Sequence, residues 1–281
     1  MQKRVLTIQD ISCIGRCSLT VALPILSAAG FETAILPTAV LSTHTGGFTG
    51  YTFRDLTEDI APIFEHWKKT GFEMAAVYSG YLGSFEQIRL VSEMFRYYKS
   101  SGAVIMVDPA MADNGKYYPA FDADFGAGMA KLCRNADIVV PNLTEAAFML
   151  GEPVCLEGYD RHYIEELMKR LCTLGPTKAV LTGVSFEENK LGAASYDAET
   201  GEVGYYFADK LPGYYHGTGD VYASVLLGAY MNGKSLAQSA AIAVDFTVSS
   251  LKKTCDMGAD VRCGVDFEET LPELMRAVGR I

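Results

Sequence analysis

The sequence predicts an α/β fold built around a mostly parallel β-sheet. Short apolar runs rich in β-branched residues recur along the chain, and each is followed by polar, glycine or proline residues and then by a helical pattern. This alternation indicates βαβ units, which place helices on both faces of a parallel sheet. One polar, glycine-bearing connection between two strand-like runs predicts an antiparallel hairpin at an edge of that sheet.

The predicted elements follow in this order along the chain. Strands are expected at residues 5–9, 33–41, 74–78, 103–107, 136–141 and 178–182. Helical periodicity is clearest at residues 85–100, 159–174 and 236–253. The hairpin joins residues 192–196 to residues 203–207. In such a sheet ligands bind beyond the carboxyl ends of the strands, so functional residues are expected there.

Composition limits the kinds of protein that this chain can be. The 281 residues are 49% hydrophobic, which is ample for a large core. We find no internal repeat, low-complexity tract or linker, so residues 1–281 are expected to form a single domain. The net charge of −10 argues against nucleic acid or an anionic membrane as the main partner.

Cysteine usage and hydropathy bear on the cellular location. The seven cysteines are scattered and form no C-x-x-C pair, which argues against a disulfide framework or a zinc site and fits a reducing compartment. The first residues lack the apolar core of a signal peptide, and no run reaches the ~18 apolar residues of a membrane span. We therefore expect a cytoplasmic location.

The run Gly217-Thr218-Gly219-Asp220 is the most informative motif in the chain. Two glycines around a small hydroxyl residue let backbone N–H groups converge, and the helix that follows adds the positive end of its dipole, which favours an anion. Asp220 stands in the first helical turn, where it can accept a proton from a hydroxyl that attacks a bound phosphate. Loop and helix-cap chemistry alone would explain the same four residues. The helix is apolar on nearly every face through Tyr230, however, and a buried helix start needs a partner for its free N–H groups.

Three carboxylates follow neighbouring predicted strands. Asp108 and Asp113 come after the fourth strand and Glu145 after the fifth, and hard oxygen ligands of this kind suit a magnesium ion that keeps most of its waters. Turn or cap chemistry explains each residue equally well when it is taken alone. As a set aligned with the glycine turn, the three carboxylates favour a metal.

Two further loops carry candidate ligand-binding residues. His44 lies in the glycine-rich turn after the second strand, where it can contact a small ring, although a loop histidine bound to backbone groups is an equal alternative. Residues 114–119 are polar, flexible and aromatic, as a flap over a nucleotide would be, although most such loops are only connectors.

Taken together, these motifs resemble those of the ribokinase-like superfamily and, within it, the pyridoxal kinase branch. The stretches that carry the resemblance keep the family order and are 6–9, 42–46, 79–84, Asp108-Pro109 with Asp113, Pro141-Asn142 with Glu145, and 217–220. The Ser-Gly-Tyr-Leu-Gly-Ser stretch and the His44-Thr45 turn look specific to this branch, whereas Gly-x-Gly-Asp marks the wider superfamily. The resemblance implies a three-layer α/β/α sandwich.

The resemblance also implies an ATP-dependent kinase site. Asp220 would deprotonate the hydroxymethyl group of a vitamin B6 compound, and the amides of Gly217, Thr218 and Gly219 would hold the transferring phosphoryl group. Residues that would bind ATP are Asp108, Asp113, Tyr117, Asn142, Glu145, Thr182 and Gly183, and the three acidic ones would also handle Mg2+. Residues that would line the pyridine pocket are Asp10, Ser12, His44, Thr45 and Tyr81. A homodimer is implied as well, and a monovalent-cation requirement stays open.

One position departs from the family pattern. Relatives commonly have Gln-Ser after the first strand, with the serine on the pyridine ring, whereas this chain has Gln9-Asp10. A carboxylate therefore replaces a neutral donor. We expect Asp10 to shift the preference among the B6 vitamers toward one with a cationic amine, or Ser12 to take over the contact.

Other functions are weighed against this one. A hydroxymethylpyrimidine or hydroxymethylpyrimidine-phosphate kinase shares the fold, but such enzymes typically begin with Gly-Ser-Asp-Ser-x-Gly-Gly and often have cysteine where Asp220 stands. A vitamin B6 binding or regulatory protein without turnover would not need the intact glycines and Asp220. A dinucleotide oxidoreductase would need G-x-G-x-x-G after the first strand, which residues 14–18 do not supply.

Overall fold

A nine-stranded sheet runs through the computed structural model, which describes residues 2–258 and 260–281. Its strands are β1 (Arg4–Ile14), β2 (Glu32–Thr43), β3 (Phe53–Asp55), β4 (Ala76–Ser79), β5 (Val104–Val107), β8 (Ile138–Val139), β9 (Lys178–Val184), β10 (Lys190–Asp197) and β11 (Glu202–Asp209). They lie in the order β11-β10-β9-β8-β5-β4-β1-β2-β3. A separate small sheet pairs β6 (Ala112–Asp113) with β7 (Lys116–Tyr117).

The sheet confirms the predicted fold class. All pairs from β9 through β8, β5, β4 and β1 to β2 are parallel, and these six strands are the six that the sequence predicts. At one edge β10 and β11 form the predicted antiparallel hairpin beside β9. At the other edge β3 pairs antiparallel with β2. No sequence pattern predicts β3, because its three residues are exposed and show no apolar alternation.

Strand lengths differ from the predicted ones because pairing, and not apolar composition, sets where a strand ends. The first strand was predicted to end at residue 9, but β1 continues to Ile14, which still pairs with Thr43 of β2. The fifth was predicted over 136–141, but β8 comprises only Ile138 and Val139, the two residues that pair with both neighbours.

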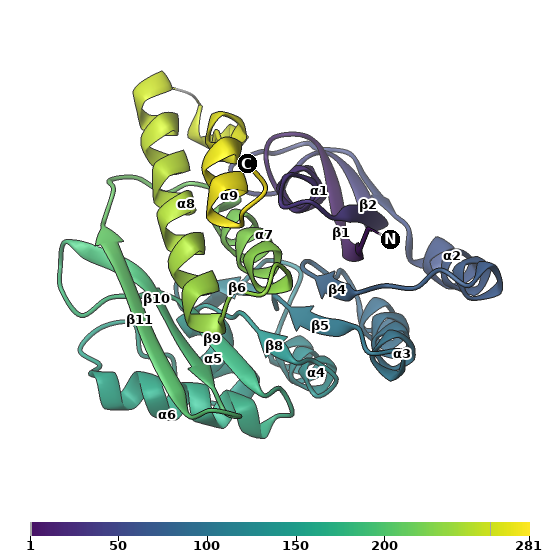
Figure 1. Ribbon diagram of the computed structural model, residues 1–281, viewed down its shortest axis with the longest axis horizontal. Coiled ribbons are helices and arrows are strands. Elements are labelled where there is room, and N and C mark those ends of the chain that lie inside the picture. The colour runs from purple at the N-terminus through teal and green to yellow at the C-terminus, as the bar shows by residue number, and fades with distance from the viewer. Residues whose placement is uncertain (1, 259) are drawn as a thin grey trace.

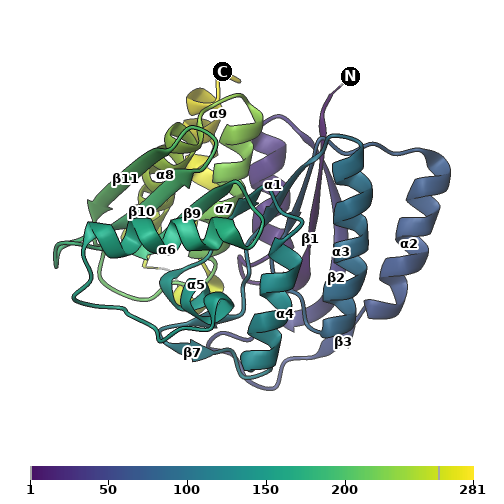
Figure 2. The same ribbon diagram turned by 90° about the horizontal axis from the view of Figure 1, so that it is seen from below.

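Helices cover both faces of the sheet. They are α1 (Leu19–Ala28), α2 (Thr57–Thr70), α3 (Phe85–Ser100), α4 (Ala123–Cys133), α5 (Leu143–Leu150), α6 (Arg161–Thr173), α7 (Thr218–Met231), α8 (Leu236–Met257) and α9 (Leu271–Ala277), with short 3-10 turns at Val261–Cys263 and Glu268–Thr270. Helices α2 to α6 lie on one face, and α1, α7, α8 and α9 lie on the other (Figures 1 and 2). The three predicted helices correspond to α3, α6 and α8.

The apolar side chains of the parallel strands divide between two cores. In β1, Leu6 and Ile8 belong to the core under α2 to α6, whereas Val5 belongs to the core under α1, α7, α8 and α9. In β4, Val77 and Tyr78 divide in the same way. Successive side chains of a strand point to opposite faces, so a strand covered on both sides needs apolar residues at every position. The short continuous apolar runs of the sequence are explained by this double coverage.

Helix α7 is buried on nearly every side, as the sequence predicts. All of its residues from Val221 to Ala229 are buried. The helix packs against α1 and α8 in its own layer and lies over the sheet. Its first turn is more open than the rest of the helix, since Gly219 is exposed.

The starts of α1 and α7 differ from those of most other helices. A side chain caps the first turn of α3, α4, α5, α6 and α8, through Ser84, Asp122, Asn142, Asp160 and Ser235. Neither α1 nor α7 has a side-chain cap in the described structure. Helices α2 and α9 also lack a side-chain cap. The starts of α1 and α7 differ from these because they meet each other, through the hydrogen bond from Ser18 to Asp220, so their free N–H groups can satisfy one anion together.

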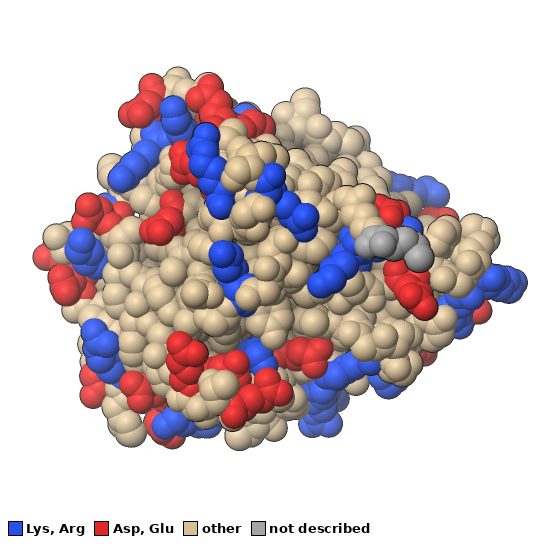
Figure 3. Space-filling model, viewed as in Figure 1, with Lys and Arg blue, Asp and Glu red and all other residues tan. Residues whose placement is uncertain are grey.

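One face of the molecule carries mixed charge (Figure 3). On the face shown in Figure 3, basic and acidic side chains are interspersed around the rim, and uncharged residues fill much of the centre. Within residues 2–258 and 260–281, no helix is long and apolar enough to cross a membrane.

Packing in the α1 layer can be tested with two leucines of one helix. Leu26 is fully buried, whereas Leu23 is 38% exposed. We expect Leu26→Ala to lower the free energy of unfolding by about 2–5 kcal/mol, because the substitution removes buried methyl groups and leaves a cavity. Leu23→Ala is the matched control, with an expected loss below about 1 kcal/mol. Urea denaturation measures both, and equal losses would contradict the assigned burial.

Candidate active site

The turn before α7 is shaped for close approach of another segment. Gly217 has a left-handed backbone (φ 77°), and a Cβ at this position would overlap the carbonyl oxygen of Arg16. Thr218 begins α7, and its hydroxyl donates to the carbonyl of Tyr215 at 3.3 Å. Gly219 is exposed, with open space where a Cβ would stand. The turn therefore needs glycine on its packed side and leaves room for a ligand on its open side.

Asp220 is held by two donors from the turn between β1 and α1. Its Oδ2 accepts from the backbone N–H of Ser18 at 2.9 Å and from the Sγ–H of Cys17 at 3.4 Å. Burial raises the pKa of Asp220 to about 6, although the hydrogen bond from Ser18 opposes this rise. A carboxylate with a pKa near the working pH is well suited to act as a general base.

Cys17 and Ser18 are neighbours of Asp220 that no motif in the sequence predicts. The Cys17 thiol donates to Oδ2 of Asp220. Burial and the nearby charges of Asp220 and Asp10 raise the pKa of this thiol well above its usual value, so it stays protonated. Only the three-dimensional packing of residues about 200 positions apart reveals this contact, and no local motif signals it.

Asp10 and Ser12 lie together near Asp220. Asp10 is only 6% exposed, and the Ser12 hydroxyl donates to its Oδ2 at 3.4 Å. Burial raises the pKa of Asp10 above its usual value. The charge of Asp10 in turn raises the pKa of Asp220, which places the two carboxylates in one neighbourhood. The structure thus brings the position that departs from the family pattern close to Asp220.

Tyr81 and His44 adjoin the same region. Burial, and then the charge of Asp10, raise the pKa of Tyr81 to about 12. His44 uses both ring nitrogens on backbone groups, because Nδ1 accepts from the N–H of Gly46 at 3.1 Å and Nε2 contacts the carbonyl of Arg262 at 2.5 Å. His44 is therefore a neutral ring fixed by the backbone, as one of the two sequence alternatives has it. Thr45 next to it is exposed.

His216, for which the sequence predicts no chemical role, packs against the rings of His44 and Tyr214. The His216 ring lies 5.1 Å from the His44 ring and 5.2 Å from the Tyr214 ring. A Cβ on Gly46 would overlap the His216 ring, which explains why this turn is glycine-rich. Burial lowers the pKa of His216, so the ring is neutral near pH 7.

The three predicted metal-binding carboxylates Asp108, Asp113 and Glu145 all accept hydrogen bonds from protein groups. Glu145 is occupied by the backbone, since Oε1 accepts from Met111 and Ala112 and Oε2 accepts from Asn142. Asp113 Oδ2 accepts from the Tyr214 hydroxyl at 2.9 Å. Among the described residues, no three His, Cys, Asp or Glu side chains lie close enough together to hold a metal ion. The start of α5 and the β6–β7 hairpin use several of these oxygens, and a magnesium ion that keeps most of its waters stays a prediction.

The charge balance near these carboxylates nevertheless suits a cation. Asp108 is buried, and burial followed by the charges of Glu145 and Asp220 raises its pKa well above the usual value. Burial raises the pKa of Glu145 to about 7 even though three backbone N–H groups lower it. Carboxylates that repel one another in a buried site gain from a nearby positive charge. The donor set fits a hydrated magnesium ion better than one with direct protein ligands.

The remaining nucleotide candidates lie on the same side of the sheet. Asn142 caps α5 through Oδ1, and its Nδ2 donates to the carbonyl of Ala112 at 2.8 Å. Thr182 pairs with Asn142 in an isolated bridge, and Gly183 is exposed with a left-handed backbone (φ 73°). The predicted flap is a short hairpin turned by Asn114 and Gly115, both with positive φ.

The two neighbouring tyrosines of this segment, Tyr117 and Tyr118, have different surroundings. The Tyr117 ring stacks on Phe148 at 4.1 Å and packs against Gly126, so it is turned toward α4 and α5. Burial raises the pKa of Tyr118, and the charges of Glu145, Asp108 and Asp113 add to this. Tyr118 is 38% exposed and lies where the charges of these carboxylates act on it, so it joins Tyr117 as a candidate residue of the flap.

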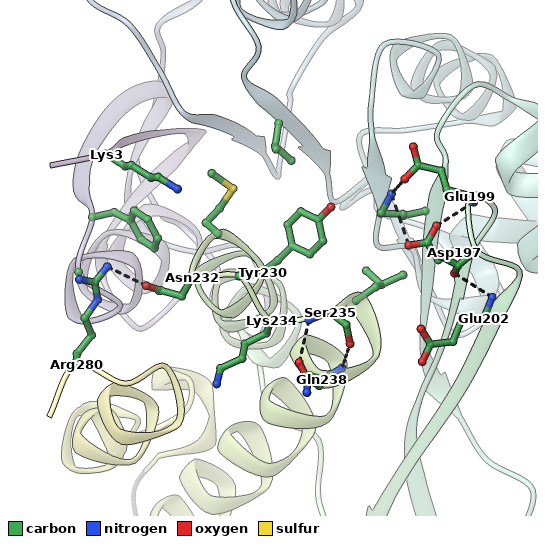
Figure 4. Close-up of a pocket in the computed structure, with 18 of the residues that line it drawn as sticks. Lys3, Asp197, Glu199, Glu202, Tyr230, Asn232, Lys234, Ser235, Gln238 and Arg280 are labelled. Atoms are coloured by element: carbon green, nitrogen blue, oxygen red, sulfur yellow. Dashed lines mark hydrogen bonds and ion pairs between the residues drawn. The ribbon is translucent and has the colours of Figure 1, made fainter. Parts of the chain in front are cut away.

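A large cavity elsewhere does not coincide with these residues. A space of ≈ 1090 Å³ opens at the opposite edge of the sheet, where β1, β5 and β9 begin. Figure 4 shows Lys3 and Arg280 on one side of it and Asp197 and Glu199 on the other. Lys178 forms ion pairs with both acidic residues. None of the predicted site residues lines this cavity, and ligands of parallel α/β sheets bind at the other edge.

Comparison with known proteins identifies the family. The model of the phosphomethylpyrimidine kinase family matches residues 26–264. A pyridoxal kinase of Arabidopsis thaliana is 26% identical over 90% of this chain and 82% of its own length. Among solved structures, a putative phosphomethylpyrimidine kinase of Bacteroides thetaiotaomicron, in a crystal form with pyridoxal, is 36% identical, with a TM-score of 0.93 over 98% of this chain and 96% of its own.

A second solved structure supports the same assignment. The pyridoxal kinase of Lactobacillus plantarum is 32% identical, with a TM-score of 0.89 over 98% of each chain. Both solved structures are more than 30% identical to this chain over nearly its full length, and both share its arrangement of strands and helices. The chain therefore belongs to the phosphomethylpyrimidine kinase family, in the pyridoxal kinase branch of the ribokinase-like superfamily.

Proposed function

We propose that this chain is an ATP-dependent kinase that phosphorylates the 5'-hydroxymethyl group of pyridoxal, pyridoxine or pyridoxamine. The observation that carries the proposal is Asp220, a base with its pKa raised to about 6, in the first turn of a helix without a side-chain cap. The names of the Arabidopsis thaliana and Lactobacillus plantarum relatives, and the pyridoxal in the Bacteroides thetaiotaomicron structure, support this substrate class.

In the proposed reaction, the substrate hydroxyl attacks the γ-phosphorus of ATP and ADP leaves. Both protein hydrogen bonds described for Asp220 end on Oδ2, so Oδ1 is the oxygen that takes the hydroxyl proton. The N–H groups of Gly217, Thr218 and Gly219 and the positive end of the α7 dipole stabilise the charge on the transferring phosphoryl group. Asp220 needs no further activation, because burial has already raised its basicity.

The nucleotide side of the site is assigned to the loops after β5, β8 and β9. When bound, Mg2+ would neutralise the phosphate charge. Asp108, Asp113 and Glu145 would hold the ion mainly through its waters, since protein groups already occupy many of their oxygens. Asn142, Thr182, Gly183 and Tyr117 complete the proposed nucleotide set, and Tyr118 joins it from the hairpin.

The substrate side of the site is assigned to the end of β1 and the loops after β2 and β4. Asp10 and Ser12 would hydrogen-bond polar groups of the pyridine ring, and the neutral His44 ring and Tyr81 would pack beside it. Thr45 lies at the exposed rim. A single catalytic domain over residues 1–281, a homodimer and a cytoplasmic location remain part of the proposal, and a monovalent-cation requirement stays open.

Hydroxymethylpyrimidine phosphorylation is the second candidate. The matching family model is that of phosphomethylpyrimidine kinases, which favours this activity. Both substrates are planar nitrogen heterocycles with a hydroxymethyl group, so the same Asp220 chemistry would serve either one. The choice between them rests on ring contacts at Asp10, Ser12 and Tyr81.

The proposal is tested by measuring ATP consumption with magnesium on a panel of pyridoxal, pyridoxine, pyridoxamine and hydroxymethylpyrimidine, with products identified by mass. We expect phosphorylation of at least one B6 vitamer and loss of turnover when EDTA removes the metal. Turnover of the pyrimidine alone would move the protein to the second candidate function. Binding without turnover of all four compounds would favour a regulatory vitamin B6 protein.

Asp220→Asn tests the base. We expect kcat to fall by about 10²–10⁴, because the amide cannot accept the proton, while nucleotide binding is retained. In the wild type, kcat/KM should fall as the pH drops below about 6, since protonation of Asp220 removes the base. Asp245→Asn, an exposed position on α8, is the matched control and should keep full activity. Near-normal turnover of Asp220→Asn would remove Asp220 from this role.

Asp10→Ser tests the substrate preference. If Asp10 pairs with a cationic amine, the variant should lose roughly tenfold or more in kcat/KM for pyridoxamine relative to pyridoxal, because a hydrogen bond to a charged group is worth about 1.5–3 kcal/mol. Steady-state kinetics on both vitamers measure the ratio. An unchanged ratio would mean that Asp10 does not select the amine. Ser12→Ala, measured alongside, shows whether Ser12 makes the contact instead.

A further inference from the structure

Two glycines that are distant in sequence, Gly217 and Gly264, pack closely against the turn of residues 16–18. A Cβ on Gly217 or on Gly264 would overlap the carbonyl oxygen of Arg16, and both glycines have positive φ. The backbone N–H of Arg16 donates to the carbonyl of Cys263 at 2.8 Å. The turn is thus fixed on one side to the start of α7 and on the other to the segment after α8.

The same turn supplies both protein hydrogen bonds described for Asp220. Ser18 donates through its backbone N–H and has a positive φ of 55°, which is uncommon for a residue other than glycine. Cys17 donates through its thiol. A strained backbone conformation persists only where its surroundings hold it in place, and such strain is often found at functional sites.

An ion pair links the turn to the segment after α8. Arg16 Nη2 lies 2.5 Å from Asp266 Oδ1, and Arg16 Nε lies 2.7 Å from Glu268 Oε1. Asp266 is only 6% exposed, and its backbone N–H donates to the Thr254 hydroxyl at 2.8 Å. A buried ion pair adds little to stability, because desolvation offsets the attraction. Its geometry, in contrast, fixes where the Arg16 backbone lies.

We propose that Arg16 is a positioning residue, whose ion pair with Asp266 holds the Arg16–Ser18 turn so that Ser18 and Cys17 bind Oδ2 of Asp220 and leave Oδ1 toward the substrate. The inference rests on the proposed function, in which Asp220 is the base. The structure supports it through one continuous chain of contacts, from Asp266 to Arg16, through the turn, to Asp220.

Loss of the donors from Ser18 and Cys17 would change both the orientation of the Asp220 carboxylate and its pKa. A carboxylate that loses hydrogen bonds to its charged form is protonated more easily. The other titratable groups that face this region are Asp10 of β1, Asp108 after β5 and Tyr78 of β4. Burial and the charge of Asp10 oppose ionisation of Asp220, whereas the two donors of the turn, Ser18 and Cys17, favour it.

Arg16→Gln is the first test. We expect kcat to fall roughly 10- to 100-fold, since a misplaced base is no longer aligned with the hydroxyl, and KM for ATP to stay within about twofold. The acidic limb of the kcat profile should move to higher pH, a change that loss of stability alone does not produce. Arg89→Gln, which removes a surface arginine paired with Glu86 and Glu93, is the matched control.

Further variants keep the proposal testable if Arg16→Gln does not fold. Asp266→Asn removes the charge of the partner and retains its size, and it should reproduce the loss of kcat. Cys17→Ala removes one donor and should move the acidic limb to higher pH, and Cys17→Ser, which restores a donor, should move it back. Cys172→Ala, a half-buried cysteine in α6, controls for cysteine removal.

The outcomes separate this inference from the proposed function. If Asp220→Asn abolishes turnover but the folded Arg16, Asp266 and Cys17 variants keep the wild-type kcat and pH profile, the positioning role is overturned and the function stands. A lower Tm with unchanged kinetics also overturns it. If Asp220→Asn itself keeps normal turnover, the assignment of the base fails, whatever the Arg16 variants do.

Discussion

The parallel order of six central strands is the constraint on which the rest of the structure depends. Because these strands point the same way, all of their carboxyl ends lie at one edge of the sheet, and the loops after them meet there. The starts of α1 and α7 reach the same edge, as the hydrogen bond from Ser18 to Asp220 shows. Charged and polar residues from distant parts of the chain are brought together there, while apolar side chains fill the two cores on either side of the sheet.

Burial at this edge gives the acidic residues their unusual chemistry. Asp10, Asp108, Glu145 and Asp220 all have raised pKa values, and burial is the first cause in each case. The protein places more negative charge in one region than its own donors neutralise. In the proposed function, the Mg2+ ion that accompanies the nucleotide would offset part of this negative charge. The same burial raises the pKa of Asp220 to about 6, which is the basicity that its proposed role as general base needs.

Rigid surroundings hold these groups in place. Glu145 ties the β6–β7 hairpin to the start of α5 through three backbone N–H groups, and so fixes the loop that carries Asp113. Tyr214 then joins Asp113 to the segment before α7. Arg16 and Asp266 form the corresponding link between the turn from β1 to α1 and the segment between α8 and α9. In each case one side chain links two loops. Glu145 looks like a metal ligand in the sequence, whereas Tyr214 and Arg16 belong to no motif there.

The sequence by itself determined the features that depend on local patterning. The six parallel strands, the edge hairpin, helix α3 and the buried helix behind the glycine turn follow from side-chain periodicity and from the backbone freedom of glycine, which act over a few residues. The placement of Asp220 in the first turn of that helix follows in the same way. Only the tertiary structure decided that β1 extends to Ile14, that Glu145 serves backbone groups and that His44 is neutral. It alone shows that Cys17 and Ser18 bind Asp220, because such partners are distant in sequence and meet only when the two cores pack against the sheet.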